Sequence, residues 1–423
     1  MARVTVVGAG VVGVSSAWYL ARAGFEVTVI DRQPVPAAET SFANGGQISV
    51  SHSEPWANPQ APLKVLKWLA RADAPLLFRP RADWRQWWWL AAFLRECSAA
   101  RTRENIRRLV ALGVYSRDCL RALREDTGID YQAQTRGIVH FYTDAAEFEA
   151  AREPARLMSE LGCERRIVGA DEAVRIEPAL ASIGPALAGA TFSPEDESGD
   201  AHRFTLELAR RCEAAGVRFL PGYQVTALRA ETRPAPRSRI DHAEAIDPNG
   251  RYLRLDSDHW VLAAGSWSPL LAAPLGLRLN VYPAKGYSVT MPVADPDKAW
   301  QASLTDDAHK LVFSRLGDRL RIAGTAELSG WDRSLNRRRC EAILARVRQL
   351  FPGAGDAERA EFWSGLRPAT PSNVPCLGPT RYANLHLNTG HGTLGWTLAC
   401  GSGRVLADLI GGRRPEVAWG TDS

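Results

Sequence analysis

Residues 3–31 read RVTVVGAGVVGVSSAWYLARAGFEVTVID, and this stretch decides the fold. It predicts a buried strand, a glycine turn, a helix, and a second strand that ends on Asp31. The turn matches the G-x-G-x-x-G fingerprint of dinucleotide sites: Gly8 permits the tight turn, Gly10 lets a pyrophosphate approach the helix N-terminus, and Gly13 packs helix on strand. Asp31 is placed to accept hydrogen bonds from a ribose. The predicted dinucleotide contacts of this unit are Gly8, Ala9, Gly10, Val11, Val12, Gly13, Asp31 and Arg32.

The composition is that of a folded α/β chain. Hydrophobic residues make up 45% and charged residues 23% of the 423 residues, which excludes a disordered, collagenous or coiled-coil protein. The net charge of +5 comes from interspersed charges, so we expect no nucleic-acid partner. The seven cysteines are scattered without metal-ligand spacing, which predicts a reducing compartment and no metal site. The N-terminus lacks the pattern of a signal peptide, and no apolar run approaches the ~20 residues that span a bilayer.

Three later segments decide which dinucleotide is bound. A nicotinamide enzyme of this type needs one βαβ unit, whereas several distant segments must contact a buried flavin ring. Residues 41–47, 263–267 and 388–396 each combine a strand end with glycines that allow close backbone approach. The last segment opens a helix whose N-terminus would face negative charge that develops on a reduced flavin. The predicted flavin contacts are Ser41, Asn44, Gly45, Gly46, Gln47, Val225, Ala264, Gly265, Gly392, Thr393, Leu394 and Gly395.

The order of the predicted elements divides the chain into pieces of two domains. A helical region from residue 64 to residue 124, followed by strands at 135–142 and 187–192, indicates a second sheet that interrupts the nucleotide-binding domain. The predicted fold class is α/β, with a discontinuous Rossmann-like FAD-binding domain and an inserted α+β substrate domain. We expect the FAD-binding domain at residues 1–62, 201–276 and 341–423, and the substrate domain at residues 63–200 and 277–340.

Longer motifs extend along the whole chain. The most specific are GLRPATPSNVPCLG at 365–378 and NTGHGTLGWTLACGSGR at 388–404; GAGVVGV at 8–14 is common to many flavin and nicotinamide enzymes. The others are SFANGGQIS at 41–49, PWANP at 55–59, YSRDCL at 115–120, DESGD at 196–200 and YPAKGYSVT at 282–290. Together they resemble the amine-oxidising flavoproteins that include D-amino-acid oxidase, glycine oxidase and sarcosine oxidase. Within that superfamily the chain resembles the catalytic small subunit of bacterial D-amino-acid dehydrogenases.

The resemblance implies a reaction and a cofactor. The cofactor is FAD, which we expect to be non-covalent because no cysteine lies in the predicted flavin segments. The reaction is hydride transfer from a D-alanine-like amino acid to FAD, which gives an imino acid that hydrolyses to a 2-oxo acid and ammonia. The electrons then pass to a quinone or another acceptor that is not oxygen. Two alternatives stay open: an oxygen-using oxidase of glycine, sarcosine or hydroxyproline, and a non-catalytic FAD-binding subunit.

Three residues are the candidates for contact with the substrate. Arg367 is expected to bind the substrate carboxylate, because a guanidinium offers a fixed bidentate fork. His391, between two glycines, is expected at the flavin or the substrate, with a structural role as the alternative. Tyr287 would lie with Lys285 on the substrate side of the ring, although half-buried packing is the commoner role of such a tyrosine. His52 is a weaker candidate. No protein base is required if the substrate amine is neutral before transfer.

A tryptophan-rich helix is predicted around residues 84–94. Its tryptophans lie among arginines, a composition that suits an interfacial helix on an anionic membrane. The alternative, which we favour, is packing against the substrate domain, because the consecutive residues Trp87, Trp88 and Trp89 cannot share one helix face. We expect the protein on the cytoplasmic side, either free or peripheral on the inner membrane.

Overall fold

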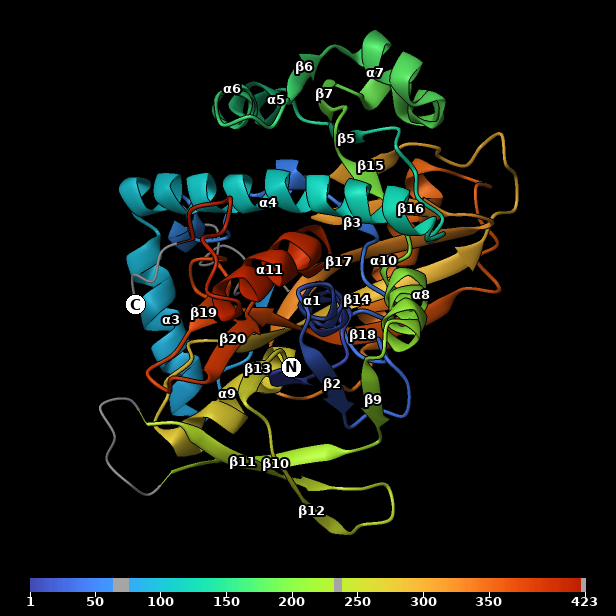
Figure 1. Cartoon of the computed structure of the whole chain (residues 1–423). Coiled ribbons are helices and arrows are strands. Elements are labelled where there is room, and N and C mark those ends of the chain that lie inside the picture. Colours follow the sequence, from blue (N-terminus) through green and yellow to red (C-terminus); the bar gives the residue numbers. More distant parts are fainter. Residues whose placement is uncertain (64–75, 232–237, 420–423) are drawn as a thin grey trace.

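The computed structural model describes residues 1–63, 76–231 and 238–419. Within them, the chain is organised around a six-stranded sheet and a nine-stranded sheet (Figure 1). Segments far apart in the sequence alternate between the two sheets, as the prediction of a discontinuous nucleotide-binding domain requires. The predicted α/β fold class is confirmed.

The six-stranded sheet is built on the predicted βαβ unit. β1 (Arg3–Val7) and β2 (Glu26–Asp31) pair in parallel, and α1 (Val11–Arg22) connects them. The strand order is β19–β20–β13–β1–β2–β9, with β19 antiparallel to its neighbour and the other pairs parallel. The remaining strands are β9 (Arg218–Pro221), β13 (His259–Leu262), β19 (Cys376–Pro379) and β20 (Leu385–Thr389). Parallel strands of this kind need cover on both faces.

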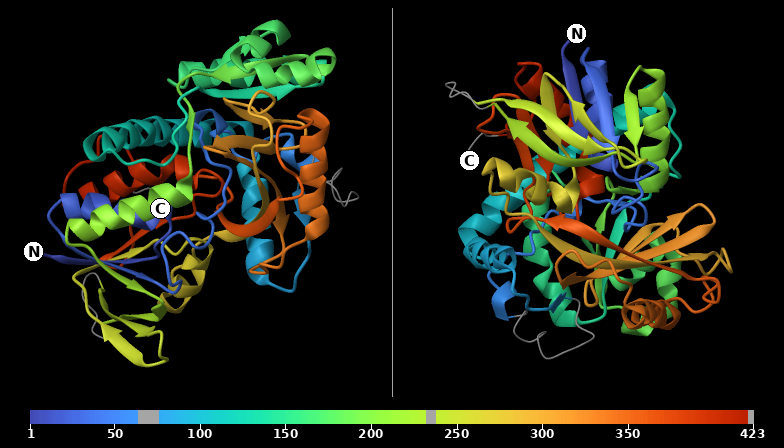
Figure 2. Two further views of the ribbon diagram at one scale, coloured as in Figure 1. Left: turned by 90° about the vertical axis from the view of Figure 1, so that its right-hand side faces the viewer. Right: turned by 90° about the horizontal axis from the view of Figure 1, so that it is seen from below.

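Helices cover one face of this sheet and a small sheet covers the other. α1 packs with α8 (Ala201–Ala214), α11 (Gly395–Ile410) and α4 (Ala99–Thr127) around one apolar core, and α4 lies across α11 (Figure 1). The three-stranded sheet of β10 (Gln224–Ala230), β11 (Ile240–Ile246) and β12 (Tyr252–Leu255) lies on the opposite side from α4 (Figures 1 and 2). Its core includes Leu228, Ile240 and Trp260.

The nine-stranded sheet has the order β18–β14–β17–β16–β15–β5–β7–β6, and β4 adds to β17. Its strands are β4 (Leu76–Phe78), β5 (Ile138–Tyr142), β6 (Arg166–Val168), β7 (Gly189–Ser193), β14 (Tyr282–Pro292), β15 (Ser303–Asp306), β16 (Leu311–Leu316), β17 (Arg319–Leu328) and β18 (Glu361–Ala369). α10 (Arg337–Leu350) buries Cys340, Ile343 and Val347 against one face. The other face meets the loop at residues 41–47, because Ser314 of β16 donates to the carbonyl oxygen of Gly45 at 2.7 Å.

The remaining elements are short or peripheral. They are β3 (Gln47–Ile48), β8 (Glu197–Ser198), α3 (Trp84–Glu96), α5 (Ala145–Ala150), α6 (Arg152–Glu160), α7 (Ala170–Ile176), α9 (Ser268–Ala272) and the 3-10 helices Val50–His52, Pro178–Ala186, Gly265–Trp267 and Ala273–Leu275.

Three expectations need correction. The region predicted to be helical from residue 64 contains the strand β4, and its residues 64–75 lie outside the described residues. The expected domain boundary at residue 340 does not fit the sheets, because β18 pairs with β14 along its whole length. α4, expected in the substrate domain, buries Leu120 and Leu123 in the core of the nucleotide-binding layer. Strand pairing and helix packing bring both segments to partners that are remote in sequence. The other boundaries stay predictions.

Candidate active site

A cavity of about 2070 Å³ lies between the layer of the six-stranded sheet and the nine-stranded sheet. Its walls come from the β1–α1 turn, residues 37–62, the start of α11 and one face of the nine-stranded sheet. Every predicted cofactor contact lines it except Ala9 and Gly13, and so do Arg367, His391, Tyr287 and His52. Pockets for one ligand typically measure ~300 to 1,000 Å³, so this cavity has room for a dinucleotide and a further molecule.

Glycine stands at the three positions of the G-x-G-x-x-G fingerprint for different structural reasons. A Cβ on Gly8, whose φ is +116°, would lie 2.5 Å from the carbonyl oxygen of Ala263, and a Cβ on Gly13 would lie 1.9 Å from that of Gly8. Both are therefore required by the packing of the chain itself. Gly10 has an ordinary φ of −72°, and its Cβ would meet only the Ser41 Oγ at 3.5 Å. Nothing in the described chain requires glycine at position 10, so the space fits a phosphate against the helix N-terminus.

The carboxylate of Asp31 borders the same end of the cavity. It accepts hydrogen bonds from the backbone N–H groups of Ala9, at 2.6 Å, and Gln33, at 2.8 Å. Burial raises the pKa of Asp31, and these backbone donors oppose the rise. The fixed carboxylate is suited to a ribose hydroxyl. The Arg32 guanidinium beside it stacks 3.9 Å from the centre of the Trp267 ring.

The loop at residues 41–47 is pressed onto the nine-stranded sheet. A Cβ on Gly45 would lie 2.5 Å from a methyl group of Val312, and the Asn44 side chain caps the turn by accepting from the Gly46 N–H at 2.9 Å. Arg321 donates to the carbonyl oxygen of Asn44 at 3.0 Å. The glycine pair thus permits a close approach that leaves a thin wall beside the cavity, which fits the edge of a planar ring.

The turn before α11 is joined to the strand that carries Arg367. His391 forms an isolated bridge with Ala369, and the Gly392 N–H donates to the carbonyl oxygen of Pro368 at 2.9 Å. The His391 Nε2 lies 3.1 Å from the Ser402 hydroxyl. Burial lowers the pKa of His391 to about 3, so the imidazole is neutral at physiological pH. α11 begins without a side-chain cap, which leaves N–H groups at its N-terminus for a ligand.

Arg367 is a buried cation at the cavity wall. Its guanidinium crosses Gly286 of the neighbouring strand, where a Cβ would lie 2.2 Å away, and donates to the carbonyl oxygens of Thr325 at 2.7 Å and Gly324 at 3.4 Å. No acidic side chain of the described ranges pairs with it. Burial alone lowers the pKa of Arg367 to about 10, so it stays charged. An unpaired buried charge is costly, and an anionic ligand would offset that cost.

Tyr287 and Lys285 were expected on the substrate side of the ring, and they lie on the strand face opposite to that of Arg367. Arg367 pairs with Ala284 in the sheet, so residues 285 and 287 point to the opposite face. The Tyr287 hydroxyl donates to Glu327 at 2.8 Å, and its ring packs in the core cluster that α10 covers. Lys285 is absent from the cavity wall and pairs with Asp332 at 2.9 Å. The Tyr287 hydroxyl is thus occupied by Glu327, the residue still borders the cavity, and a catalytic role for Tyr287 stays a prediction.

Sequence reasoning missed two contributors. Thr325 is β-branched yet has a φ of +52°, and its buried Oγ1 has no hydrogen-bond partner, a strained arrangement beside Arg367. Asp196 is fully buried and accepts from the N–H groups of Val50 and Ser51, at 3.0 and 3.1 Å, which fixes the turn that carries His52 into the cavity wall. The DESGD motif was a signal for Asp196. Nothing local marks Thr325.

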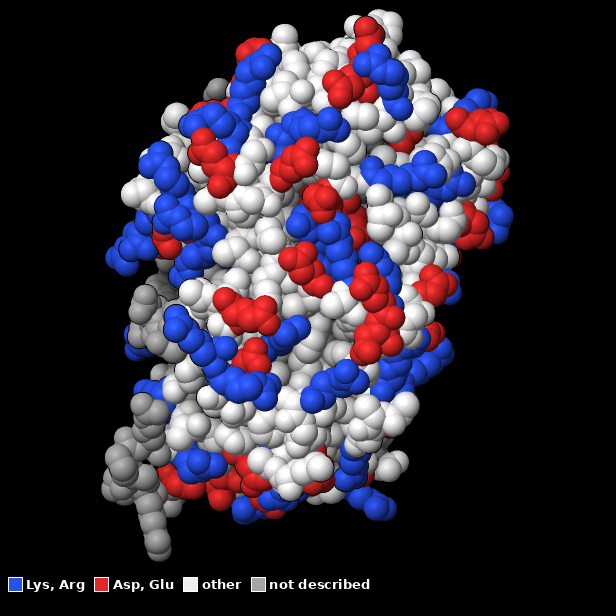
Figure 3. All heavy atoms as spheres, turned by 45° about the horizontal axis from the view of Figure 1, so that its top comes forward, with Lys and Arg blue, Asp and Glu red and all other residues white. Residues whose placement is uncertain are grey.

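The predicted tryptophan-rich helix is α3. Trp89 is buried and donates to the carbonyl oxygen of Ala369 at 2.8 Å, whereas Trp84 and Trp87 are 58% and 49% exposed. The helix therefore packs through one face and presents aromatic rings on another. No described helix is long and apolar enough to cross a membrane. On the face seen in Figure 3, basic and acidic side chains are interspersed.

Comparison with known proteins places this geometry in a family. The model of the DAO family, described as FAD dependent oxidoreductase, matches residues 3–409. D-amino acid dehydrogenases of Dechloromonas aromatica and Paramagnetospirillum magneticum are 55% and 54% identical over 98% of this chain, and the matches cover 98% and 96% of those proteins. A solved glycine oxidase from Geobacillus kaustophilus has a TM-score of 0.73 at 23% identity, covering 99% of this chain and 97% of that one. The L-proline dehydrogenase of P. horikoshii has a TM-score of 0.74 at 17% identity, covering 98% and 95%.

These matches confirm the family resemblance and the FAD cofactor. The glycine cradle at Gly10, the thin wall at Gly45 and the open N-terminus of α11 fit that group. The chain belongs to the DAO family of FAD-dependent oxidoreductases.

Proposed function

We propose that this protein is an FAD-dependent D-amino-acid dehydrogenase that oxidises D-alanine-like substrates to 2-oxo acids and ammonia. The observation that carries the proposal is Arg367, a buried and unpaired guanidinium on the wall of the cavity that also holds the FAD-binding segments. A guanidinium in this setting is complementary to an α-carboxylate. The names of the relatives at 55% and 54% identity support the D-amino acid as the substrate class.

The chain contributes binding and orientation to the reaction. Arg367 holds the carboxylate, and its two bonds to main-chain carbonyls prevent the guanidinium from turning. Neutral His391, fixed by Ser402, offers a hydrogen bond without a competing charge. Bound FAD supplies the acceptor for the hydride from the substrate α-carbon. The substrate amine must lose its proton before transfer, since the imine forms from a free lone pair.

We propose a quinone as the physiological acceptor, with the protein peripheral on the cytoplasmic side of the membrane. Exposed Trp84, Trp87 and Leu94 of α3, next to Arg85 and Arg95, support such a surface, and Leu94 also lines the cavity. Replacing Trp84 and Trp87 by serine should then reduce sedimentation of the holoenzyme with anionic vesicles. Equal sedimentation of wild type and variant would contradict the membrane part of the proposal.

Steady-state turnover of D-alanine tests the function as a whole. The proposal predicts pyruvate and ammonia in equal amounts, with one quinone analogue reduced per turnover and little hydrogen peroxide in air. Stoichiometric peroxide would instead identify an oxygen-using oxidase. Absence of turnover with every amine and acceptor would indicate a non-catalytic FAD-binding subunit.

A further inference from the structure

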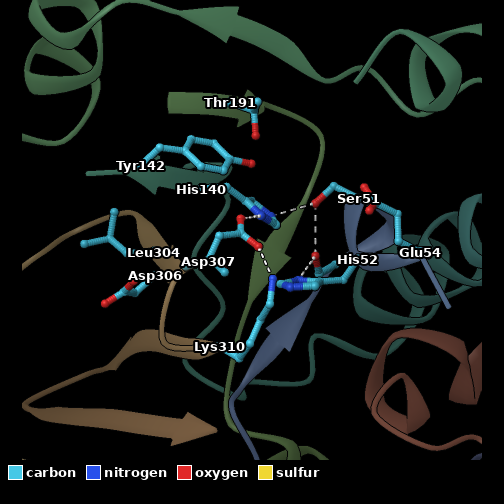
Figure 4. A network of polar contacts seen from close by, with 12 residues as sticks. Ser51, His52, Glu54, His140, Tyr142, Thr191, Leu304, Asp306, Asp307 and Lys310 are labelled. Atoms are coloured by element: carbon cyan, nitrogen blue, oxygen red, sulfur yellow. Dashed lines mark hydrogen bonds and ion pairs between the residues drawn. The ribbon is translucent and has the colours of Figure 1, made fainter. Parts of the chain in front are cut away.

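A cluster of polar side chains forms part of the cavity wall away from the FAD-binding turn. We call it the polar recess (Figure 4). Its members come from four remote segments and all line the cavity: Ser51, His52, Glu54, His140, Arg165, Asp307 and Lys310. Ser51, His140 and Arg165 are buried, whereas the Glu54 and Lys310 side chains are 42% and 54% exposed. Buried polar groups cost free energy unless they are well paired, so the buried part of this cluster needs a reason.

Strand register places the recess on the same sheet face as Arg367. Thr305 of β15 is paired with His140 of β5 on one side and with Val312 of β16 on the other. The three side chains therefore point to one face of the sheet, and this face borders the cavity because the Gly45 loop packs on Val312. Asp307 and Lys310 lie in the turn between β15 and β16, and the contact of Asp307 with His140 brings both to that face. The His140 Nδ1 lies 3.1 Å from Asp307, whose other oxygen accepts from the Lys310 ammonium at 2.9 Å.

A second row of contacts fixes His52 against His140. The two rings lie 4.6 Å apart, and the Ser51 hydroxyl lies 3.3 Å from the His140 Nε2. The Ser49 hydroxyl lies 3.2 Å from the His52 Nδ1. Buried Asp196 holds this turn from behind through the backbone. The imidazoles therefore have fixed orientations before any ligand arrives.

The recess offers unused hydrogen-bonding groups to the cavity. The His52 Nε2 has no partner in the part of the chain that the structure describes, and Lys310 uses one of its three N–H groups on Asp307. Burial and neighbouring His140 lower the pKa of His52, so its ring is neutral. Burial opposes the charge of Lys310, but Asp307 raises its pKa. Lys310 also has a φ of +53°, an unusual conformation for a residue with a side chain.

The charges in the recess balance. Arg165 pairs with Glu54 at 2.7 Å, and Lys310 pairs with Asp307. A ligand with a full charge would disturb one of these pairs, whereas a neutral group with an oxygen acceptor would use the free donors. A carboxamide has this chemistry.

The Lys310 end of the recess is the part that lies nearest to Arg367. The guanidinium bonds to carbonyls of β17, and the carbonyl oxygen of Lys310 lies against Gly324 of that strand. Neighbouring strands are about 4.8 Å apart, so the Lys310 backbone lies about one strand spacing from the β17 carbonyls that Arg367 contacts, whereas His140 on β5 lies about three spacings from them. A glutamine side chain extends about 5 Å beyond its α-carbon, estimated from C–C bonds of ~1.5 Å.

We propose that the polar recess binds the side chain of the substrate and selects D-amino acids that end in a carboxamide, with Lys310 and His52 donating to its oxygen. This assignment rests on the proposed function, because it requires Arg367 to hold the α-carboxylate. It gives the cavity a specificity site distinct from the FAD-binding segments.

Anaerobic stopped-flow reduction of the holoenzyme tests the assignment with D-glutamine and D-alanine. In Lys310→Met and His52→Phe, the second-order rate constant of flavin reduction by D-glutamine, divided by that for D-alanine, should fall at least tenfold. Lys298→Met is the matched control, since Lys298 forms an exposed pair with Asp295 at the same i,i+3 spacing, and its ratio should stay within twofold. Flavin absorbance per chain shows that each variant retains its fold and cofactor.

The outcomes separate failure of the inference from failure of the proposed function. The recess is not a side-chain site if the variants slow flavin reduction by both substrates equally, so that the ratio of the two rate constants is unchanged. It is also not such a site if the wild type reacts with D-alanine but not with D-glutamine. Slower reoxidation by a quinone analogue with unchanged reduction would overturn it too, in favour of an acceptor site. Wild type that reacts with neither D-amino acid would refute the proposed function itself.

Discussion

Replacing Arg367 by lysine should weaken the use of D-alanine far more than it weakens FAD binding. Lysine keeps the charge but has one nitrogen, which cannot serve the carbonyl oxygens of Gly324 and Thr325 and also both oxygens of a carboxylate. Loss of one charge-assisted hydrogen bond costs about 1.5 to 3 kcal/mol. At about 1.4 kcal/mol per factor of ten, kcat/KM should fall roughly 10- to 100-fold.

The assay is kcat/KM for D-alanine with a quinone analogue, alongside flavin content per chain. Arg337→Lys is the matched control, because Arg337 of α10 is 74% exposed, pairs with Glu341 at 4.0 Å and lies 5.5 Å from the centre of the Phe362 ring. It should behave as wild type. Unchanged kcat/KM in Arg367→Lys would refute the carboxylate site, and parallel loss of flavin and activity would assign Arg367 a structural role instead.

Four further predictions concern the cofactor and pH. Gly10→Val should fold but purify without yellow colour, because a Cβ at position 10 meets only the Ser41 hydroxyl within the protein and the side chain would occupy the space proposed for the pyrophosphate. Circular dichroism and flavin absorbance check this, and full occupancy would contradict it. Acid precipitation of the holoenzyme should release FAD into the supernatant, and colour kept in the pellet would show a covalent bond. The value of kcat/KM should rise toward alkaline pH, with an apparent pKa equal to that of the free substrate amine. The same rise should be seen in His391→Asn and Tyr287→Phe, and its loss in either variant would identify that residue as the base. Burial lowers the pKa of His391 from 6.5 to about 3, so below pH 6.5 the unfolded chain binds a proton that the folded chain does not, and the free energy of unfolding falls. Between pH 7 and pH 5, His391→Asn should therefore lose about 2 kcal/mol less of this free energy than wild type. Thermal unfolding at the two pH values measures the losses, and equal losses would contradict the prediction.

The cofactor half of the site could be predicted because its signals are local. The strand, the glycine turn and the helix at residues 3–22 are adjacent in sequence, and the periodicity of each element is intact. Gly45 and Gly392 were found in the same way, as glycines at strand ends. The sequence alone did not distinguish the roles of the three glycines: Gly8 and Gly13 are required by packing, whereas Gly10 leaves space for a ligand.

The substrate half depends on register, which no local pattern specifies. Alternation along β14 says that Lys285 and Tyr287 share a face, but only the pairing of Ala284 with Arg367 shows that this face is turned away from the guanidinium. Thr325 gains its strained conformation from the sheet around it. His52, His140 and Lys310 come together across gaps of many residues, so their association appears only in the fold.

Anaerobic titration of the holoenzyme with D-alanine and L-alanine tests the central claim most directly. The absorbance of oxidised FAD should bleach with D-alanine, one equivalent of pyruvate should form per flavin after hydrolysis, and L-alanine at the same concentration should leave the spectrum unchanged. Bleaching by L-alanine alone, or by neither enantiomer, would contradict the assignment of this cavity to D-amino-acid oxidation.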